Sequence, residues 1–325
     1  MNTPPTTAAL TLSLTGPFQR QGAEAAEGVR LWAEMAGIRL ILVDDGGSTD
    51  TAVQAYTDWV DSIDLLIGPY SSGLVRAVAS LVRDAGRLLW NHGGSADDLA
   101  QPGVAFLPAP ASSYFDGVVD EAVARQVDQL VVARGAGPFA RAVADGAARR
   151  AAESGLDIRI VDASWVDVED AAATALLIVG RFEEDVAAVR RLLDRRQSPA
   201  LLAAVAAGIP AFGQELGPAA EGVLGPAQWW PTARRPEIGP SGTEFVTCYR
   251  QRTGHKPSYP AAQAAAAGYL AHAAHQLRLT GHNVVHWATS TLLGDFALDA
   301  AWRQVGHRVT TVRWQGGDMV PIAAG

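Results

Sequence analysis

The segment from Leu65 to Ser95 constrains the fold of this chain more than any other. It reads LLIGPYSSG, continues as an apolar run with helical spacing, and ends in LLWNHGGS. This order predicts two buried strands joined by a helix, with a loop of small and hydroxyl-bearing residues after each strand. Both loops leave the sheet at the carboxyl end of a strand, where open α/β sheets bind their ligands. We therefore expect the two loops to form one binding site.

The first of these loops has the residues of a helix start. Gly68 and Pro69 end the strand. Ser71 or Ser72 is then a natural N-cap for a helix that continues to Ala85. Backbone N–H groups at a helix start, with hydroxyl groups beside them, hold an anion well.

The second loop offers further groups to the same site. Gly93 and Gly94 let the main chain come close to a ligand, and Ser95 is another hydroxyl donor. A carboxylate would fit between the two loops. An alternative stays open, in which Ser71 only caps a helix, Gly93 and Gly94 only make a turn, and no ligand binds. Taken alone, either loop is better explained by this alternative.

Five segments of the chain occur in an order that is typical of one protein family. They are IGPYSSG, LLWNHGGSADDL, GVLGPAQWWP, KPSYPAAQAAAAGYLAHAA and QVGHRVTTVRWQGG. Through them the chain resembles, from about Leu10 to about Ile322, the substrate-binding proteins of branched-chain amino acid ABC transporters. The resemblance implies the type I periplasmic-binding fold and a receptor without catalytic activity. It also implies a small-molecule ligand, closure of two domains on that ligand, and an ABC permease as partner.

Strands and helices alternate along the chain at the spacing of parallel, doubly wound sheets. We therefore expect an α/β protein with two such domains, and the resemblance adds three crossovers and a ligand cleft between the domains. The first domain is expected to contain residues 1–109 and 230–293. The second is expected to contain residues 110–229 and 294–325.

Local patterns give three expectations about the chain path. Ser112 or Ser113 is expected to cap a helix that runs through Arg125. The segment VVHWATSTLL is expected to be the last of three helices that follow the second crossover. The terminal GHRVTTVRWQGGDMVPI predicts a hairpin in the second domain, with QGG at its turn.

The candidate ligand-binding residues follow from these loops and from the resemblance. In the first domain they are Gln21, Ser72, Gly93, Gly94 and Ser95, and in the second they are Tyr114, Phe139, Arg181 and Phe182. The resemblance implies that Ser72 and Ser95 hold the α-carboxylate of the ligand and that the Gly93 carbonyl accepts from its ammonium group. Gln21 replaces an aromatic residue that is frequent in the family, which suggests a more polar contact. Arg181 is either a ligand contact or a solvated loop arginine.

The resemblance also gives an expectation about specificity. Receptors of this family usually place an acidic residue beside the ligand's ammonium group, in the loop after a strand that here reads PALLAAV. This chain has AAVAAG in that stretch and no acidic residue before Glu215. A buried ammonium without a charge partner costs several kcal/mol, on the order of the cost of an uncompensated buried ion. We therefore expect a ligand with a carboxylate or amide group, and weak affinity for ordinary α-amino acids.

Other functional classes find little support in the sequence. A formal net charge of −8 and the absence of a basic stripe argue against a nucleic-acid partner. The chain contains no GxSxG, HExxH, P-loop or GxGxxG motif at the required place, so we expect neither catalysis nor a cofactor. His272 and His275 lie one helical turn apart, but such a pair without a carboxylate or cysteine nearby is more often a surface feature than a metal site.

The amino-terminal sequence leaves the compartment open. MNTPPTTAAL has no basic region, no apolar core and no small-residue cleavage site, so we expect no signal peptide in it. No run of about 18 apolar residues could span a membrane. Either the numbering is that of a mature or trimmed chain, or this member of the family stays in the cytosol. In the second case the alternative function is a cytosolic small-molecule sensor of the amidase-regulator type.

Overall fold

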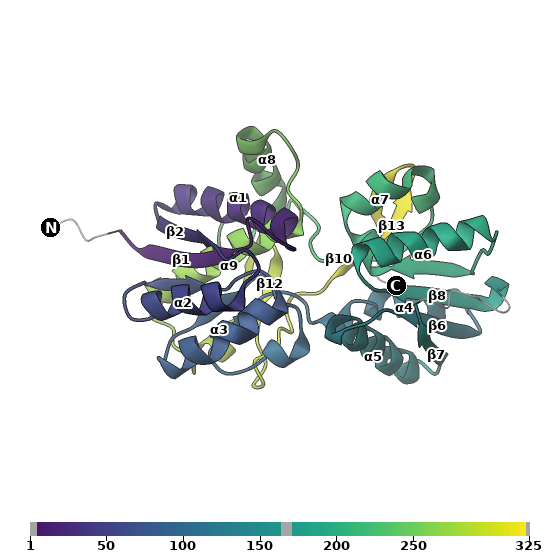
Figure 1. Cartoon of the computed structure of the whole chain (residues 1–325), viewed down its shortest axis with the longest axis horizontal. Helices are drawn as coiled ribbons and strands as arrows, with labels where there is room; N and C mark the ends of the chain where they lie inside the picture. Colours follow the sequence, from purple (N-terminus) through teal and green to yellow (C-terminus); the bar gives the residue numbers. More distant parts are fainter. Residues whose placement is uncertain (1–4, 164–170, 323–325) are drawn as a thin grey trace. The chain divides into compact units, whose positions relative to one another are not determined.

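The computed structural model describes residues 5–163 and 171–322, and the chain divides into two compact units. The first unit consists of Met1–Ala109 and Trp229–His307, and the second of Pro110–Gln228 and Arg308–Gly325. The chain therefore passes from one unit to the other three times. Each unit contains a largely parallel sheet covered by helices (Figure 1), which confirms the predicted α/β class.

The first sheet has five parallel strands in the order β2-β1-β3-β4-β5. They are β1 (Thr7–Leu12), β2 (Arg39–Asp44), β3 (Leu65–Ile67), β4 (Leu89–Asn91) and β5 (Val104–Phe106). Strand β2 is added on one side of β1, and all later strands are added on the other side. Connections from neighbouring strands then leave the sheet in opposite directions, and a crevice opens at the carboxyl ends of β1 and β3.

Helices cover both faces of the first sheet. They are α1 (Gln19–Ala36), α2 (Thr49–Trp59), α3 (Ser72–Asp84), α8 (Gly242–Thr253) and α9 (Tyr259–Gln276), with a 3₁₀ turn at Asp97–Leu99. Right-handed crossovers that run in opposite directions place α1 and α2 on opposite faces. Helix α1 packs against α9, and α2 packs against α3. The contact between α1 and α9 is close, since a Cβ atom on Gly28 would lie 2.1 Å from the carbonyl oxygen of Ala261.

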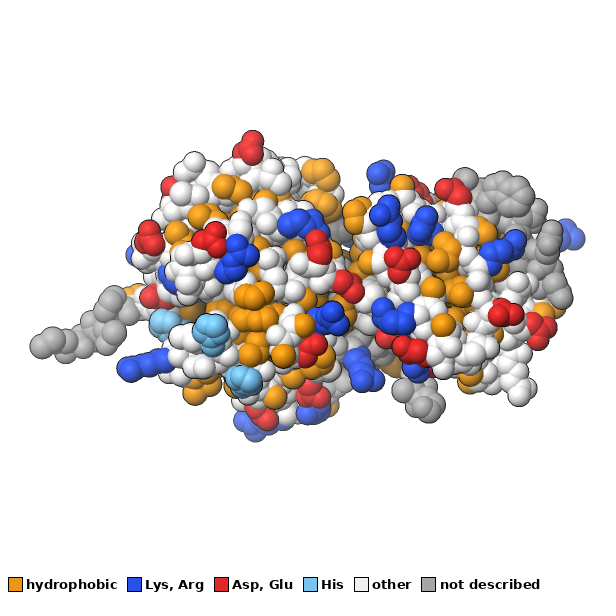
Figure 2. Space-filling model, turned by 90° about the horizontal axis from the view of Figure 1, so that it is seen from below, with side chains coloured by type: hydrophobic (Ala, Val, Ile, Leu, Met, Phe, Trp, Pro, Cys, Tyr) orange, Lys and Arg blue, Asp and Glu red, His pale blue; other side chains and the backbone are white. Residues whose placement is uncertain are grey.

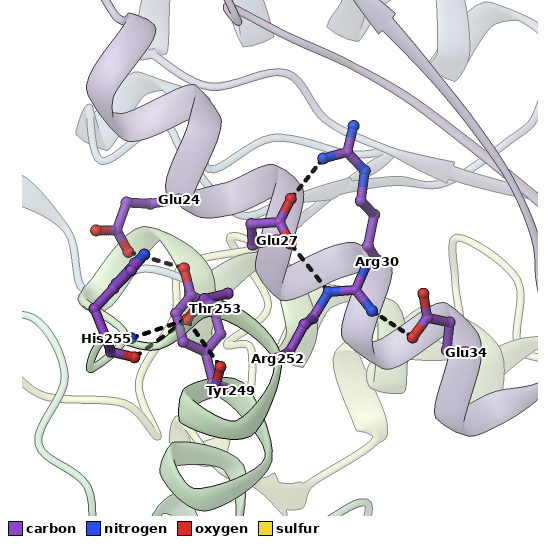
Figure 3. A network of polar contacts seen from close by, with 8 residues as sticks. All are labelled: Glu24, Glu27, Arg30, Glu34, Tyr249, Arg252, Thr253 and His255. Carbon is purple, nitrogen blue, oxygen red and sulfur yellow. Dashed lines mark hydrogen bonds and ion pairs between the residues drawn. The ribbon is translucent and has the colours of Figure 1, made fainter.

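A network of polar side chains attaches α8 to α1 (Figure 3). The guanidinium of Arg252 on α8 lies 3.0 Å from Glu27 Oε2 on α1. One turn earlier on α1, Glu24 accepts hydrogen bonds from the Tyr249 hydroxyl at 3.3 Å and from Ser258 N at 3.2 Å. The second of these bonds fixes the segment that leads from α8 into α9.

The expected third helix over VVHWATSTLL is wrong. The structure has a 3₁₀ turn over Val284–His286, followed by β11 (Thr289–Thr291), which pairs antiparallel with β12 (Gly294–Phe296). β-Branched threonines favour the extended conformation, and the partner strand satisfies their backbone. Because β12 pairs with β11, the chain stays in the first unit through His307, in contrast to the expected boundary after residue 293.

The second sheet has seven strands in the order β14-β13-β10-β9-β8-β6-β7. They are β6 (Gln129–Arg134), β7 (Asp157–Asp162), β8 (Thr174–Val179), β9 (Leu201–Ala204), β10 (Leu224–Ala227), β13 (Thr310–Gln315) and β14 (Asp318–Pro321). Strands β6 to β10 are parallel and repeat the order of the first sheet, so the crevice of this sheet lies between β6 and β8. Strands β13 and β14 form the predicted hairpin, turned at Gly316 and Gly317, and extend the sheet antiparallel to β10.

The helices of the second unit are α4 (Asp116–Ala124), α5 (Pro138–Glu153), α6 (Phe182–Asp194) and α7 (Pro210–Leu216), with 3₁₀ turns at Ala111–Ser113, Ala171–Ala173, Val205–Gly208 and Gly217–Ala220.

The expected cap of α4 by Ser112 or Ser113 is wrong. The Ser113 hydroxyl instead donates to the Pro110 carbonyl at 2.8 Å. Helix α4 starts at Asp116, and the two aromatic residues before it are buried in the core.

Across residues 5–163 and 171–322, no helix combines the length and the apolar composition that crossing a membrane requires.

Candidate functional site

The crevice of the first sheet is flanked by the loops that follow β1 and β3. Asp44 holds the loop after β1, since its Oδ1 accepts from Leu14 N at 2.9 Å and its Oδ2 accepts from the Thr15 hydroxyl at 2.8 Å. This loop leads to Phe18, whose ring centroid lies 5.9 Å from that of Tyr70 in the loop after β3. Aromatic side chains from the two loops therefore meet where the strand order reverses.

The loops that follow β3 and β4 are joined directly. Ser71 N donates to the Gly93 carbonyl at 3.3 Å, and Tyr70 and Gly93 form an isolated parallel bridge. In addition, Ala96 N donates to the Ser72 hydroxyl at 3.1 Å. The residues that the sequence singles out in these two loops therefore lie side by side.

The glycines of the second loop serve the packing of the two loops. A Cβ atom on Gly93 would lie 2.7 Å from Tyr70 Cα, and one on Gly94 would lie 3.2 Å from Ser72 Cα. The backbone N–H groups of both glycines form hydrogen bonds with Asn91. Its Oδ1 accepts from Gly93 N at 3.2 Å and from Gly94 N at 2.8 Å. These glycines thus let main chain approach main chain, and no ligand is needed to explain them.

Asn91 is a residue that sequence reasoning missed. Its side chain is fully buried, and its amide also donates to the Gly94 carbonyl at 2.8 Å. A buried amide at the end of a strand has to satisfy its hydrogen bonds locally. In the sequence, Gly93 and Gly94, which come shortly after Asn91, were the signal that could have pointed to this role.

The donors that remain available lie at the start of α3 and at Ser95. Ser71 caps the helix as predicted, and its hydroxyl accepts from Leu74 N at 3.4 Å. Its backbone has φ 89° and ψ 145°, a region that residues other than glycine rarely occupy. Within the described ranges, no hydrogen bond engages the N–H groups of Ser72 and Gly73 or the hydroxyl of Ser95. These three neutral donors can serve an anion.

The surroundings of these donors are close to neutral in charge. Burial lowers the pKa of His92 to about 4, so its imidazole is uncharged near neutral pH. Arg76 and Asp98 neutralise each other in a two-pronged ion pair, with Nε to Oδ2 at 2.9 Å and Nη2 to Oδ1 at 2.8 Å. A carboxylate bound here would be held by neutral hydrogen bonds and by the start of a helix.

Gln21 lies in the first turn of α1, the helix that follows the loop after β1. It is half-buried, and within the described ranges its side-chain amide forms no hydrogen bond. The amide is therefore available at the same edge of the sheet as Phe18. Its contact with a ligand stays a prediction.

The predicted residues of the second unit form two groups around the crevice between β6 and β8. Tyr114 is buried, and its ring packs edge-to-face on Phe139 with centroids 5.5 Å apart. Arg181 and Phe182 lie at the start of α6, where the exposed Arg181 donates its backbone N–H to Glu184 Oε2 at 2.9 Å. Phe139 packs in the apolar cluster on one face of the sheet, and Phe182 packs in the cluster on the other face. Contact of these residues with a ligand, across a cleft or otherwise, stays a prediction.

Asp185 is an acidic residue that sequence reasoning missed. Its side chain is buried, and its Oδ2 accepts from Ala206 N at 2.9 Å. Ala206 lies in the loop after β9, where the sequence has no acidic residue of its own. Asp185 shares a helical spacing with Val189 and Leu192, and this position on the buried face of α6 was the available signal.

The histidines and the charged side chains of the surface bear on other kinds of ligand. Across the described residues, no three His, Cys, Asp or Glu side chains stand close enough to share a metal ion. His272, on the last turns of α9, instead contacts the Gln276 amide at 3.2 Å. On the face shown in Figure 2, basic and acidic side chains are mixed over each unit rather than gathered in the basic stripe that a nucleic acid would need.

The fold has counterparts among solved structures. A putative branched-chain amino acid ABC transporter from Silicibacter pomeroyi has a TM-score of 0.81 at 17% sequence identity, over 98% of this chain and 96% of that chain. The branched-chain amino acid transporter substrate-binding protein from Streptococcus pneumoniae, in complex with isoleucine, has a TM-score of 0.75 at 17% identity over 97% of each chain. An ABC transporter solute-binding protein from R. palustris, in complex with benzoate, has a TM-score of 0.71 at 16% identity, over 98% of this chain and 95% of that chain.

Sequence comparison identifies the family. No curated protein sequence matches the chain. The sequence profile of the family described as Periplasmic binding protein, however, matches residues 5–318. This match covers nearly the whole chain and agrees with the two repeated sheets. The chain therefore belongs to the Periplasmic binding protein family, and it is a non-catalytic binding protein of the type I fold.

Proposed function

We propose that this protein is a solute receptor of an ABC transporter and that its ligand is a small carboxylate, with little affinity for ordinary α-amino acids. The observation that carries the proposal is the set of free donors in the first unit. Within the described ranges, the N–H groups of Ser72 and Gly73 and the hydroxyl of Ser95 have no hydrogen-bond partner. A helix start with free N–H groups favours a negative charge.

The ligands of similar proteins support a carboxylate. The S. pneumoniae protein is in complex with isoleucine and the R. palustris protein with benzoate. A third solute-binding protein, from Rhodopseudomonas palustris, is in complex with 3,4-dihydroxy benzoic acid. All of these molecules carry a carboxyl group, whereas only isoleucine also carries an ammonium group. The carboxyl group is therefore the feature of these ligands that matches the free donors.

Two features of this chain disfavour an ammonium group on the ligand. The Gly93 carbonyl already accepts from Ser71 N, so it has less capacity for a second donor. Asp185, the acid beside the loop after β9, is 1% exposed and already accepts from Ala206 N. A buried ammonium without a charge partner costs on the order of several kcal/mol. An aromatic or aliphatic acid without an ammonium group avoids this cost.

Calorimetric titration with matched ligands tests the proposal. Leucine and 4-methylpentanoate differ only in the ammonium group, and benzoate and benzyl alcohol differ in the carboxylate. We expect 4-methylpentanoate to bind at least about tenfold more tightly than leucine, and benzoate to bind more tightly than benzyl alcohol. Tighter binding of leucine than of 4-methylpentanoate would overturn the specificity, and no binding of any carboxylate in a wider screen would overturn the ligand class.

The permease partner needs a separate experiment. The receptor role predicts that the liganded protein stimulates ATP hydrolysis by the transporter encoded beside it, reconstituted in vesicles. A protein that binds a carboxylate but never stimulates any such transporter would instead fit a sensor of the same fold.

A further inference from the structure

We infer that Asp185 is a positioning residue of the second unit, whose buried carboxylate ties the loop after β8 to the loop after β9. These two loops lie at the carboxyl edge of the second sheet, the edge at which open α/β sheets bind ligands. Only the expected effect of Asp185 on ligand affinity rests on the proposed function. The tie itself is a property of the second unit alone.

The two oxygens of Asp185 face different loops. Oδ2 accepts from Ala206 N at 2.9 Å, in the 3₁₀ turn that follows β9. Oδ1 lies against the backbone of Gly180, directly after β8, where a Cβ atom would be 3.3 Å away. The Gly180 N–H is near enough to lower the pKa of the carboxyl, although it does not form a well-aligned hydrogen bond with Oδ1. One carboxylate thus spans both loops.

The neighbouring acid extends the arrangement to a third loop. Glu184 Oε2 accepts from Arg181 N at 2.9 Å and would lie 3.0 Å from a Cβ atom on Gly135, which follows β6. Gly135 N also donates to the Val179 carbonyl at 2.7 Å. The first turn of α6 therefore carries two carboxylates, of which Asp185 is bonded to the loop after β9 and Glu184 to the loop after β8, close to the loop after β6.

A carboxylate suits the position of Asp185 better than any other side chain of its size. Oδ2 accepts from the Ala206 N–H and Oδ1 faces the Gly180 N–H, so the position favours acceptor oxygens on both sides. An asparagine would offer one acceptor and would turn its NH₂ group toward one of the two donors. Protonation of the carboxyl has a similar effect, because one oxygen then carries a hydrogen.

The protonation state of Asp185 changes near neutral pH. Burial raises the pKa of the carboxyl to about 7, and the negative charge of Glu184 acts in the same direction. Arg181 is the basic residue at this helix start, and the turn Val205–Gly208 on the other side contributes no charged side chain. The tie between the loops should therefore be complete above this pH and weakened below it.

Hydrogen exchange tests the tie without any ligand. At about pH 8, we expect Ala206 N–H in the variant Asp185→Ala, which removes both acceptor oxygens, to lose about tenfold of its protection factor, the change expected for one buried hydrogen bond. Glu183→Gln is the matched control, since Glu183 lies on the same helical turn, is exposed and forms no hydrogen bond within the described ranges. Equal protection of Ala206 N–H in both variants would overturn the inference.

A further measurement separates a positioning role from a merely structural one. Benzoate affinity of the unmodified protein and of Glu183→Gln should fall as the pH is lowered from about 8 to about 6, and this step should be absent in Asp185→Asn. A step that persists in Asp185→Asn would overturn the inference. If no carboxylate binds the unmodified protein, the proposed function fails, and the protection of Ala206 N–H in Asp185→Ala compared with Glu183→Gln still decides the inference.

Discussion

The phenol oxygens of Tyr70 and Tyr259 lie 2.6 Å apart, although the two residues are separated by 189 positions in the chain. Tyr70 belongs to the loop after β3, and Tyr259 is the first residue of α9. The segment before Tyr259 is fixed in turn by the hydrogen bond from Ser258 N to Glu24 of α1. The loop that begins α3 is therefore held by contacts from the opposite end of the first unit's sequence.

Removing this contact should weaken the first unit measurably. Tyr259→Phe is expected to lower the free energy of unfolding by about 0.5–1.5 kcal/mol, the contribution of one hydrogen bond. Tyr70→Phe removes the same bond, so the double variant should lose less than the sum of the single losses in urea denaturation. Tyr269→Phe on α9 is the control, because the one hydrogen-bond contact of its hydroxyl with the described residues is to the Met35 sulfur at 3.7 Å. Strictly additive losses would show that the two hydroxyl groups do not stabilise each other.

Ser95 provides the cleanest test of the anion site. Ser95→Ala should weaken binding of a carboxylate by about 1–3 kcal/mol in calorimetric titration, while thermal stability stays nearly unchanged. Ser72→Ala should weaken binding and also stability, because the Ser72 hydroxyl accepts from Ala96 N. Ser80→Ala, at an exposed position of α3, should affect neither. Full affinity in both Ser95→Ala and Ser72→Ala would show that the site lies elsewhere.

The backbone of Ser71 is strained and should respond to glycine differently from alanine. Glycine adopts a φ of 89° without strain and alanine does not, and alanine also loses the hydroxyl cap on Leu74 N. We expect Ser71→Gly to be more stable than Ser71→Ala by about 1–3 kcal/mol. Chemical denaturation of both variants measures this difference, and equal stability would mean that the loop relaxes around Ser71.

Acid should destabilise the protein partly through His92. Burial lowers the pKa of His92 from its ordinary value of 6.5 to about 4 in the folded state. Between these pH values the unfolded chain binds a proton that the folded chain does not, so stability that is present above pH 6.5 is lost as the pH falls toward 4. The loss amounts to about 3 kcal/mol.

A pair of variants isolates the contribution of His92. Thermal denaturation between about pH 4 and pH 7 should show a shallower pH dependence in His92→Gln than in the unmodified protein. His286→Gln, at an exposed position, should keep the full dependence. Parallel curves for all three proteins would mean that His92 is not responsible for the acid sensitivity.

Close packing of α1 on α9 predicts the effect of a small substitution. Alanine is ordinarily a better helix former than glycine by about 1 kcal/mol. Gly28→Ala should nevertheless destabilise the protein, by about 1–3 kcal/mol, because its Cβ atom would lie 2.1 Å from the Ala261 carbonyl oxygen. Gly281→Ala, with its nearest neighbour 3.8 Å away, is the control. A gain in helical stability for Gly28→Ala would show that α1 and α9 can move apart.

Local patterns were sufficient to predict the two sheets and the position of the candidate loops. Each strand and helix of a βα unit has its own hydrophobic period, and parallel strands joined by one helix end at the same edge. The pairing of the Tyr70 loop with the Gly93 loop followed from this rule. The N-cap at Ser71 was also predictable, because capping depends on residues within one helical turn.

The failures of prediction occurred where contacts that form only in the folded chain decide the outcome. The segment VVHWATSTLL has an apolar composition that suits a helix or a strand, and its pairing with β12 decides for the strand at Thr289–Thr291. The role of Gly94 depends on the position of Ser72, and the role of Asp185 depends on the position of Ala206. In the last two cases, the two neighbouring residues lie 21 or more positions apart in the chain, which is beyond the reach of a local pattern.

The interleaved boundaries of the two units also affect how the protein is made on the ribosome. The second sheet is completed only when β13 pairs with β10, where the indole of Trp314 fills the space beside Gly213 and donates to the Ala207 carbonyl at 2.9 Å. The first unit likewise waits for α9 to cover α1. A nascent chain therefore carries two unfinished cores until α9 has emerged, and the second core stays unfinished until residues near 315 have emerged, with the edge of β10 open to wrong partners in the meantime. Rapid late synthesis, or a chaperone that covers this edge, would be of particular value to this protein.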